Sequence, residues 1–108
     1  MSHIDLNDRA FKALRDNVQA RTFWGDKLML AVVDLEANAE LPLHSHPHEQ
    51  GGVVLKGEVA FNIDGEVKTL HPGDLYIVPG DVEHGLKVGS SPAQLLDVFS
   101  PVREEFKY

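Results

Sequence analysis

The sequence predicts an all-β fold, a small antiparallel sandwich or barrel, and three observations lead to this prediction. Turn signals centred on glycine recur at Gly57, Gly65, Gly73 and Gly80, only 7 or 8 residues apart. The short runs between these glycines are rich in β-branched and aromatic residues, as is typical of strands. Asp64-Gly65 is also a strong hairpin signal, because a type I′ turn needs positive φ at both central positions.

Length and composition are those of one folded domain. The chain has 108 residues, 43% of them hydrophobic and 25% charged, and no apolar run is long enough to cross a membrane. Lys and Arg number 10 against 17 Asp and Glu, which gives a net charge of −7. Without a basic stripe we expect neither nucleic acid nor membrane as a partner. Cysteine is absent, which excludes disulfides and thiol nucleophiles. The N-terminus lacks the features of an export signal, so we expect a cytoplasmic protein.

The first 17 residues are predicted to form an N-terminal arm in front of the β-domain, which spans residues 18–108. Leu6, Ala10, Phe11, Leu14 and Val18 have helical spacing, and Asn7 is a candidate cap. The spacing is compatible with a short helix and equally with an irregular arm that docks on the domain.

The strands of the β-domain follow from the turn signals. The first two strands form a hairpin across Gly25-Asp26. In the later strand at residues 59–63, Val59, Phe61 and Ile63 alternate with two other residues, so we expect one face of that strand to be buried. Ser100-Pro101 ends the last strand. The predicted strands are residues 18–24, 27–35, 53–55, 59–63, 67–70, 75–78 and 93–99.

Histidine is the unusual residue type, since five of the six histidines lie between positions 44 and 84. Side chains two residues apart share one face of an extended strand, so His44 and His46 can point at one metal ion. His84 follows a Pro-Gly-Asp turn and could approach from a neighbouring strand. Gln50 has the parity of the first two histidines and Glu49 the opposite one. Three imidazoles and one oxygen would suit a divalent transition metal; the alternative is a surface loop that is merely rich in histidine.

This region resembles the two sequence motifs of the cupin superfamily. The matching patterns are His44-x-His46-x3-Gln50-x6-Gly57 and Gly73-x5-Pro79-x4-His84. The resemblance implies a single-domain antiparallel β-barrel of the jelly-roll type, the double-stranded β-helix. It also implies a divalent transition metal (Ni, Zn, Mn or Fe) in the mouth of the barrel, held by His44, His46, Gln50 and His84.

Two positions depart from the usual cupin motifs. Gln50 stands where a glutamate is usual, and Asp81 stands where a glycine is expected after Pro79. Aspartate tolerates the left-handed backbone of a turn, so the second change is mild. The first change leaves Glu49 as an alternative ligand.

The last strand carries a carboxylate among apolar residues. Leu95, Asp97 and Phe99 share one strand face. If the two apolar residues point inward, Asp97 does as well, and a carboxylate buried near a cation is often catalytic. If Leu96 and Val98 form the core instead, Asp97 points to solvent. The alternation alone leaves both possibilities open.

One branch of the cupins is especially similar: the small pectin- and alginate-degradation proteins that act on 4,5-unsaturated monouronates. The likeness rests on residues 44–50, 79–84 and 97–106, and a glutamine ligand fits this branch. It implies a metal-dependent enzyme that opens the sugar-acid ring to a linear 4-deoxy-5-keto uronate, and cupins are commonly homodimers. It further implies that Asp97, Phe99 and Arg103 line the substrate site, where they would transfer protons, wall the sugar ring and bind the carboxylate.

Several alternatives stay open at this point. Arg103 could form a surface ion pair with Glu104 or Glu105. Gly51-Gly52 could leave space for a ligand or mark a tight contact between strands. The same metal site would also serve a cupin dioxygenase or a non-catalytic sugar-binding cupin.

Overall fold

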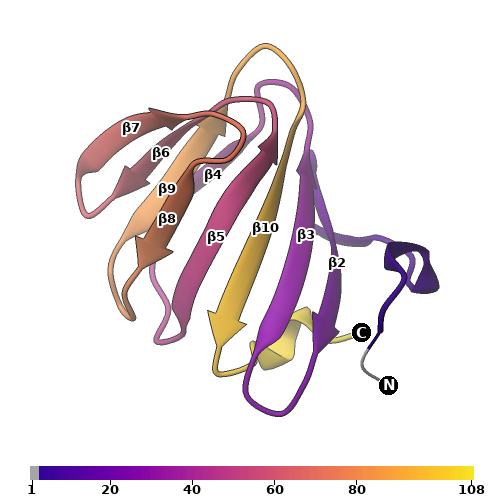
Figure 1. The fold of residues 1–108 in the computed structure, drawn as a ribbon. Helices are drawn as coiled ribbons and strands as arrows, with labels where there is room; N and C mark the ends of the chain where they lie inside the picture. The colour runs from indigo at the N-terminus through magenta and orange to yellow at the C-terminus, as the bar shows by residue number, and fades with distance from the viewer. Residues whose placement is uncertain (1–2) are drawn as a thin grey trace.

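The computed structural model describes residues 3–108, in which ten strands form two antiparallel sheets that face each other (Figure 1). The larger sheet has the order β1-β2-β3-β10-β5-β8 and the smaller one the order β4-β9-β6-β7. The strands are β1 (Lys12–Arg15), β2 (Val18–Trp24), β3 (Met29–Leu35), β4 (Glu40–His44), β5 (Glu49–Lys56), β6 (Val59–Ile63), β7 (Glu66–Leu70), β8 (Leu75–Val78), β9 (His84–Val88) and β10 (Ala93–Ser100). Within residues 3–108, no helix has the length and apolar character needed to span a bilayer.

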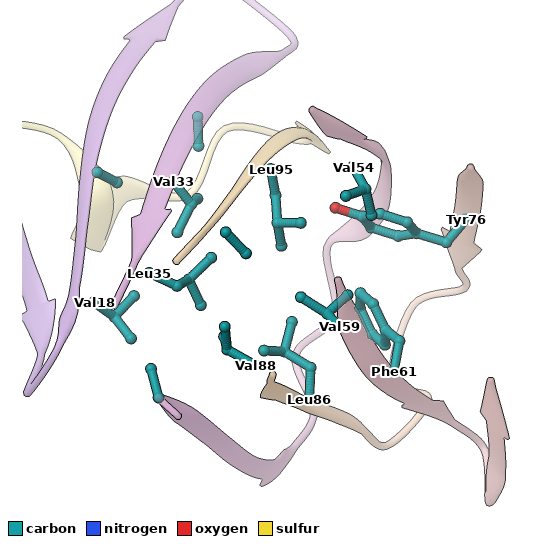
Figure 2. Packing of buried hydrophobic residues seen from close by; sticks show 14 of the residues in the cluster. Val18, Val33, Leu35, Val54, Val59, Phe61, Tyr76, Leu86, Val88 and Leu95 are labelled. Carbon is teal, nitrogen blue, oxygen red and sulfur yellow. The ribbon is translucent and has the colours of Figure 1, made fainter. Parts of the chain in front are cut away.

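The core lies between the inner faces of the two sheets (Figure 2). Strands β3 and β10 alternate strictly between buried and partly exposed side chains, because each has one face in the core and one outside. Val33 and Leu95 of the larger sheet pack toward Val59 and Leu86 of the smaller one. The predicted all-β, jelly-roll barrel is therefore confirmed.

The strongest turn signals in the sequence correctly predicted two hairpins. The hairpin across Gly25-Asp26 pairs β2 with β3 from Val18↔Leu35 to Trp24↔Met29. Asp64 and Gly65 have φ of 54° and 85° and join β6 to β7, as a type I′ turn requires. In contrast, the sequence did not reveal β4, because this edge strand is almost wholly exposed and shows no alternation. It also missed β9.

The N-terminal segment is less helical than its spacing suggested. Its helical part is a single 3-10 turn, η1 (Leu6–Asp8), and the capping residue is Asp5 rather than Asn7. The Asp5 carboxylate accepts a hydrogen bond from the Asn7 amide (2.8 Å). Residues 12–15 were therefore misread as part of a helix or irregular arm, because they form β1 and pair with the free edge of β2.

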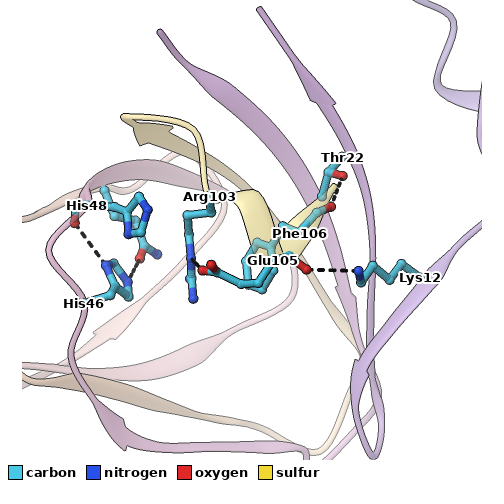
Figure 3. Close-up of polar contacts among 8 residues, drawn as sticks. Lys12, Thr22, His46, His48, Arg103, Glu105 and Phe106 are labelled. Atoms are coloured by element: carbon cyan, nitrogen blue, oxygen red, sulfur yellow. Dashed lines mark hydrogen bonds and ion pairs between the residues drawn. The ribbon is translucent and has the colours of Figure 1, made fainter. Parts of the chain in front are cut away.

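The C-terminal residues cross one end of the barrel and include the 3-10 turn η2 (Glu104–Phe106). The Thr22 hydroxyl donates to the Phe106 carbonyl (2.7 Å), and the Lys12 ammonium donates to the Glu105 carbonyl (3.0 Å; Figure 3). These bonds fix the segment to β1 and β2. They thereby hold Arg103 over the cavity described next.

Candidate metal centre

Three histidines converge at the end of the barrel that the C-terminal segment crosses. His44 is the last residue of β4, His84 is the first residue of β9, and the two are partners in the pairing of these strands. His46 lies in the loop after β4, which a hydrogen bond from the Asp81 amide to the His46 carbonyl (2.8 Å) ties to the turn before β9. One ring nitrogen from each histidine lies within 4.8 Å of the others. The three side chains are thus positioned to bind a metal ion.

The predicted grouping of these histidines is correct, but the prediction assumed the wrong backbone conformation for residues 44–46. His44 and His46 do not share a strand, because β4 ends at His44 and residues 45 and 46 are irregular. Asp81 has a φ of 66°, so aspartate does occupy a left-handed position in the turn. The turn and the paired strand ends, rather than one extended strand, bring the rings together.

Each of the three imidazoles is oriented by a backbone carbonyl. A carbonyl oxygen can only accept a hydrogen bond, so each Nδ1 carries a proton, and in a neutral imidazole Nε2 then keeps its lone pair. His84 Nε2 is buried and has no hydrogen-bond partner among residues 3–108. Histidine ligands of metals are typically oriented in this way. The three contacts are His44 Nδ1 to Pro42 O (2.8 Å), His46 Nδ1 to His48 O (3.0 Å) and His84 Nδ1 to Val82 O (2.9 Å).

The buried histidines are held in the neutral form that binds metals. Burial is the main cause that lowers the pKa of His46, and the Arg103 charge lowers it further. Burial likewise lowers the pKa of His84 to about 4. At neutral pH both rings are therefore deprotonated at Nε2 and available as ligands.

Gln50 is buried on the inner face of β5, whereas Glu49 is exposed. Gln50 Oε1 lies 3.2 Å from His46 Nε2. Both atoms present lone pairs, because the His46 proton is on Nδ1, and a cation bound by both would remove their repulsion. Three neutral imidazoles and an amide oxygen fit a divalent transition metal.

Asp97 points into the barrel, which settles the question that the alternation left open. It is 6% exposed, and its Oδ1 accepts hydrogen bonds from the Tyr76 hydroxyl (2.6 Å) and the Gln50 amide (3.1 Å). Burial raises the pKa of Asp97 to about 6, although these two hydrogen bonds and the Arg103 charge act in the opposite direction. A carboxyl group with this pKa can both accept and release protons near neutral pH.

A cavity of about 210 Å³ opens beside the histidines. Its polar lining consists mainly of His44, His84, Gln50, Asp97 and Arg103, and Phe99 contributes an apolar wall. A larger hollow of about 540 Å³ surrounds Ala93 and Gln94 at the other end of β10 and contains none of these groups. The cavity at the histidines is therefore the candidate site.

Arg103 makes the ion pair that was the alternative to a role in the site, with Glu105 as the partner, and it also lines the cavity. Its Nε donates to the Glu105 carboxylate at 2.7 Å, yet its side chain is only 14% exposed (Figure 3). The guanidinium carbon lies 3.9 Å from the centre of the Phe106 ring and 5.0 Å from that of Phe99. Packing between aromatic rings holds the planar group over the cavity.

Tyr76 is the member of this site that the sequence did not reveal. Its hydroxyl reaches Asp97 across Gly52, where an added Cβ would lie 2.6 Å from Tyr76 Cζ and 2.5 Å from the Leu96 carbonyl oxygen. Burial and the Asp97 carboxylate both raise the pKa of Tyr76, which keeps its proton. Tyr76 therefore fills the space beside Gly52. Of the two alternatives for Gly51-Gly52, a tight contact between strands fits the structure at Gly52, and space for a ligand does not.

The chain is similar to known proteins over nearly its whole length. Residues 31–99 match the family model described as the cupin domain. The pectin degradation protein KdgF of Dickeya dadantii is 29% identical over 102 residues, which cover 93% of each chain. The structure of KdgF from a Halomonas species has a TM-score of 0.92 at 25% identity and covers 99% of both chains. An RmlC-like cupin from Shewanella frigidimarina has a TM-score of 0.90 at 29% identity, covering 99% of this chain and 97% of that one.

Proposed function

This chain belongs to the cupin family, and from this membership we propose that it is a metal-dependent enzyme that converts 4,5-unsaturated monouronates into linear 4-deoxy-5-keto uronates. The observation that carries the proposal is one cavity that brings together histidines grouped closely enough to hold a metal ion, a buried carboxyl group with a pKa of about 6, and an arginine. The similarity to two proteins named KdgF, one of them named for pectin degradation, supports a sugar acid as the substrate.

His44, His46, His84 and Gln50 would hold a divalent transition metal such as Ni, Zn, Mn or Fe. When bound, the metal supplies Lewis acidity that polarises a substrate oxygen. The chain's own contribution is to present four neutral ligands, so that the charge of the metal is not reduced by its ligands. Burial of His46 and His84 keeps them in this neutral form.

The reaction is an isomerisation that needs two proton movements and no oxidant. The proton of the C1 hydroxyl leaves, the bond from C1 to the ring oxygen breaks, and an aldehyde forms at C1. The ring oxygen keeps the electron pair of that bond and remains on C5 as an enolate, which collapses to the ketone by taking up a proton at C4. Asp97 can receive the first proton and deliver the second, because its pKa lies near neutrality. Both hydrogen bonds to its carboxylate end on Oδ1, which leaves Oδ2 for the substrate.

Arg103 and Phe99 would orient the substrate. The guanidinium Nε is occupied by Glu105, and the two terminal nitrogens offer a planar fork to the substrate carboxylate. This local positive charge also offsets the net charge of −7 that would repel an anion. Phe99 provides an apolar surface against the sugar ring. A cavity of about 210 Å³ suits one sugar unit rather than a polymer.

The test is turnover of an unsaturated monouronate by chelator-treated protein before and after addition of each of the four metals. The conjugated double bond absorbs ultraviolet light and the ketone does not, so we expect the absorbance to fall only with metal present and without oxygen uptake. A metal-loaded protein that leaves both pectin- and alginate-derived monomers unchanged would refute the proposal. Oxygen consumption with bound iron would favour a dioxygenase, and tight binding without turnover a sugar-binding protein.

We also propose that the protein is a homodimer that packs through the outer face of the larger sheet. Between β3 and β8, two cross-strand rows on this face contain no charged residue, although the first row continues to Arg21 on β2. Leu75 and Ile77 of the edge strand β8 are 76% and 65% exposed. Apolar sheet faces of this kind are typical of protein interfaces, and a two-fold axis would pair the face with itself. The rows are Val32, Leu96, Val53 and Leu75, and Leu30, Val98, Gly51 and Ile77. In light scattering, Ile77→Asp should be a monomer; a dimer of unchanged affinity would refute this interface.

A further inference from the structure

Three residues on neighbouring strands of the larger sheet form a line that leads to the candidate metal centre. In the strand pairing, Tyr76 of β8 is opposite Gly52 of β5, and Gly52 is opposite Asp97 of β10. The absence of a side chain at Gly52 allows the Tyr76 ring to cross β5. Its hydroxyl therefore reaches Asp97 two strands away, at 2.6 Å, in a buried environment.

The hydrogen bonds in this line have a defined direction. Asp97 Oδ1 accepts one from the Tyr76 hydroxyl and one from Gln50 Nε2 (3.1 Å). Because the NH2 group of Gln50 faces Asp97, its Oε1 faces His46 Nε2. Rotation of the amide by half a turn would exchange the two atoms and direct the NH2 group, which cannot bind a metal, toward the histidines.

A glutamine ligand therefore has a requirement that a glutamate ligand does not have. Either oxygen of a carboxylate can bind a metal, whereas only one end of an amide can. Asp97 selects the correct end of Gln50 only if its own carboxylate is held in place, and Tyr76 makes the other hydrogen bond to the same Oδ1 atom.

We infer that Tyr76 is a positioning residue that acts through Asp97 to keep Gln50 turned toward the metal. The inference rests on the metal site proposed above. Tyr76 is not among the residues that line the cavity, so its effect should reach the metal and the substrate only through this line. The ring itself packs on Phe61, with centroids 4.7 Å apart, and this packing is retained in Tyr76→Phe.

The direct test is Zn²⁺ affinity of chelator-treated protein, measured by competition with a coloured chelator. Loss of a group that orients a ligand typically weakens a metal site 10- to 100-fold, so we expect about 10-fold weaker binding in Tyr76→Phe. In turnover of the monouronate kcat should fall with KM nearly unchanged, because Tyr76 does not touch the cavity. The matched control is Val59→Ala, which removes buried core contacts at a residue that does not itself line the cavity. This variant should lose stability but keep the wild-type Zn²⁺ affinity.

A double-mutant cycle shows whether the effect passes through Asp97. In the Asp97→Ala background, the change Tyr76→Phe should cause no further loss of Zn²⁺ affinity, because the link is already broken. Equal affinities of Tyr76→Phe and wild type, or effects that add fully in the double variant, would overturn the inference while the metal site stands. A wild-type protein that binds no metal would overturn the proposed function and this inference together.

Discussion

Replacing Asp97 by asparagine should stabilise the metal-free protein and should lower the turnover of the metal-loaded protein. The buried carboxyl group has its pKa raised from 3.8 to about 6, which means that folding disfavours its charged form. One pKa unit corresponds to about 1.4 kcal/mol, so the charge costs roughly 3 kcal/mol of folding free energy at neutral pH. Asparagine carries no charge, and its Oδ1 can still accept the hydrogen bonds from Tyr76 and Gln50.

The pH dependence of this gain has a definite sign. Between about pH 4 and pH 6 the unfolded chain has released the Asp97 proton and the folded protein has not, so wild-type stability falls as the pH rises. Above about pH 6 both states are charged and the cost stays constant. The advantage of Asp97→Asn should therefore be absent near pH 4, grow up to about pH 6 and then level off.

Denaturant unfolding of both chelator-treated proteins from about pH 4 to pH 8 measures this difference, and contributions from other groups cancel between the two. We expect a gain of about 1–3 kcal/mol at neutral pH and a rate of turnover at least about 100-fold lower. The control is Asp26→Asn, an exposed carboxylate, which should change stability by less than about 0.5 kcal/mol. An Asp97→Asn protein that is less stable than wild type at every pH would refute the reasoning.

Four further substitutions and one change of pH separate metal binding from substrate binding. His46→Ala should lose metal and activity together while the barrel still folds. Acidification of the wild type should release metal, because protons compete for the imidazoles. Equilibrium dialysis measures the bound metal in both experiments. Gln50→Ala should weaken metal binding and Glu49→Ala should not, because only the first side chain is buried beside His46; the reverse result would make Glu49 the ligand. Arg103→Lys should raise KM more than it lowers kcat, because the charge stays and the planar fork is lost; steady-state kinetics decides.

The parts of the fold that were predicted from the sequence depend on local signals. Strand β6 and the turn that follows it were predicted from alternation and Asp64-Gly65, which act within a few residues. Strand β4 has no such signal, because it lies at a sheet edge and Leu41 is its only residue that is even partly buried. The helical spacing of the N-terminal segment was misleading, since β1 forms by pairing with β2, which is a tertiary contact.

The candidate site also contains residues that the sequence predicted and residues whose role depends on tertiary contacts. The grouping of His44, His46 and His84 followed from motif spacing, and the three are brought together. The direction of Asp97 could not follow from alternation, because Leu95 and Leu96 are equally apolar and only the other sheet decides which one is buried. Tyr76 carried no signal at all, since its role depends on the register of three strands that are distant in sequence.

The charge of Asp97 that destabilises the metal-free protein should become favourable when the metal is bound. The four proposed ligands are neutral, so a divalent metal keeps its full charge, and Asp97 is the carboxylate hydrogen-bonded to one of these ligands. A nearby cation favours the charged form of a carboxyl group, so metal binding and ionisation of Asp97 should strengthen each other. At neutral pH, saturating Zn²⁺ should therefore raise the unfolding temperature of the wild type more than that of Asp97→Asn, in differential scanning calorimetry with equal protein and metal concentrations. Equal increases in the two proteins would show that Asp97 carries no charge next to the bound metal, and would remove the electrostatic basis for its assignment as the proton-transfer group.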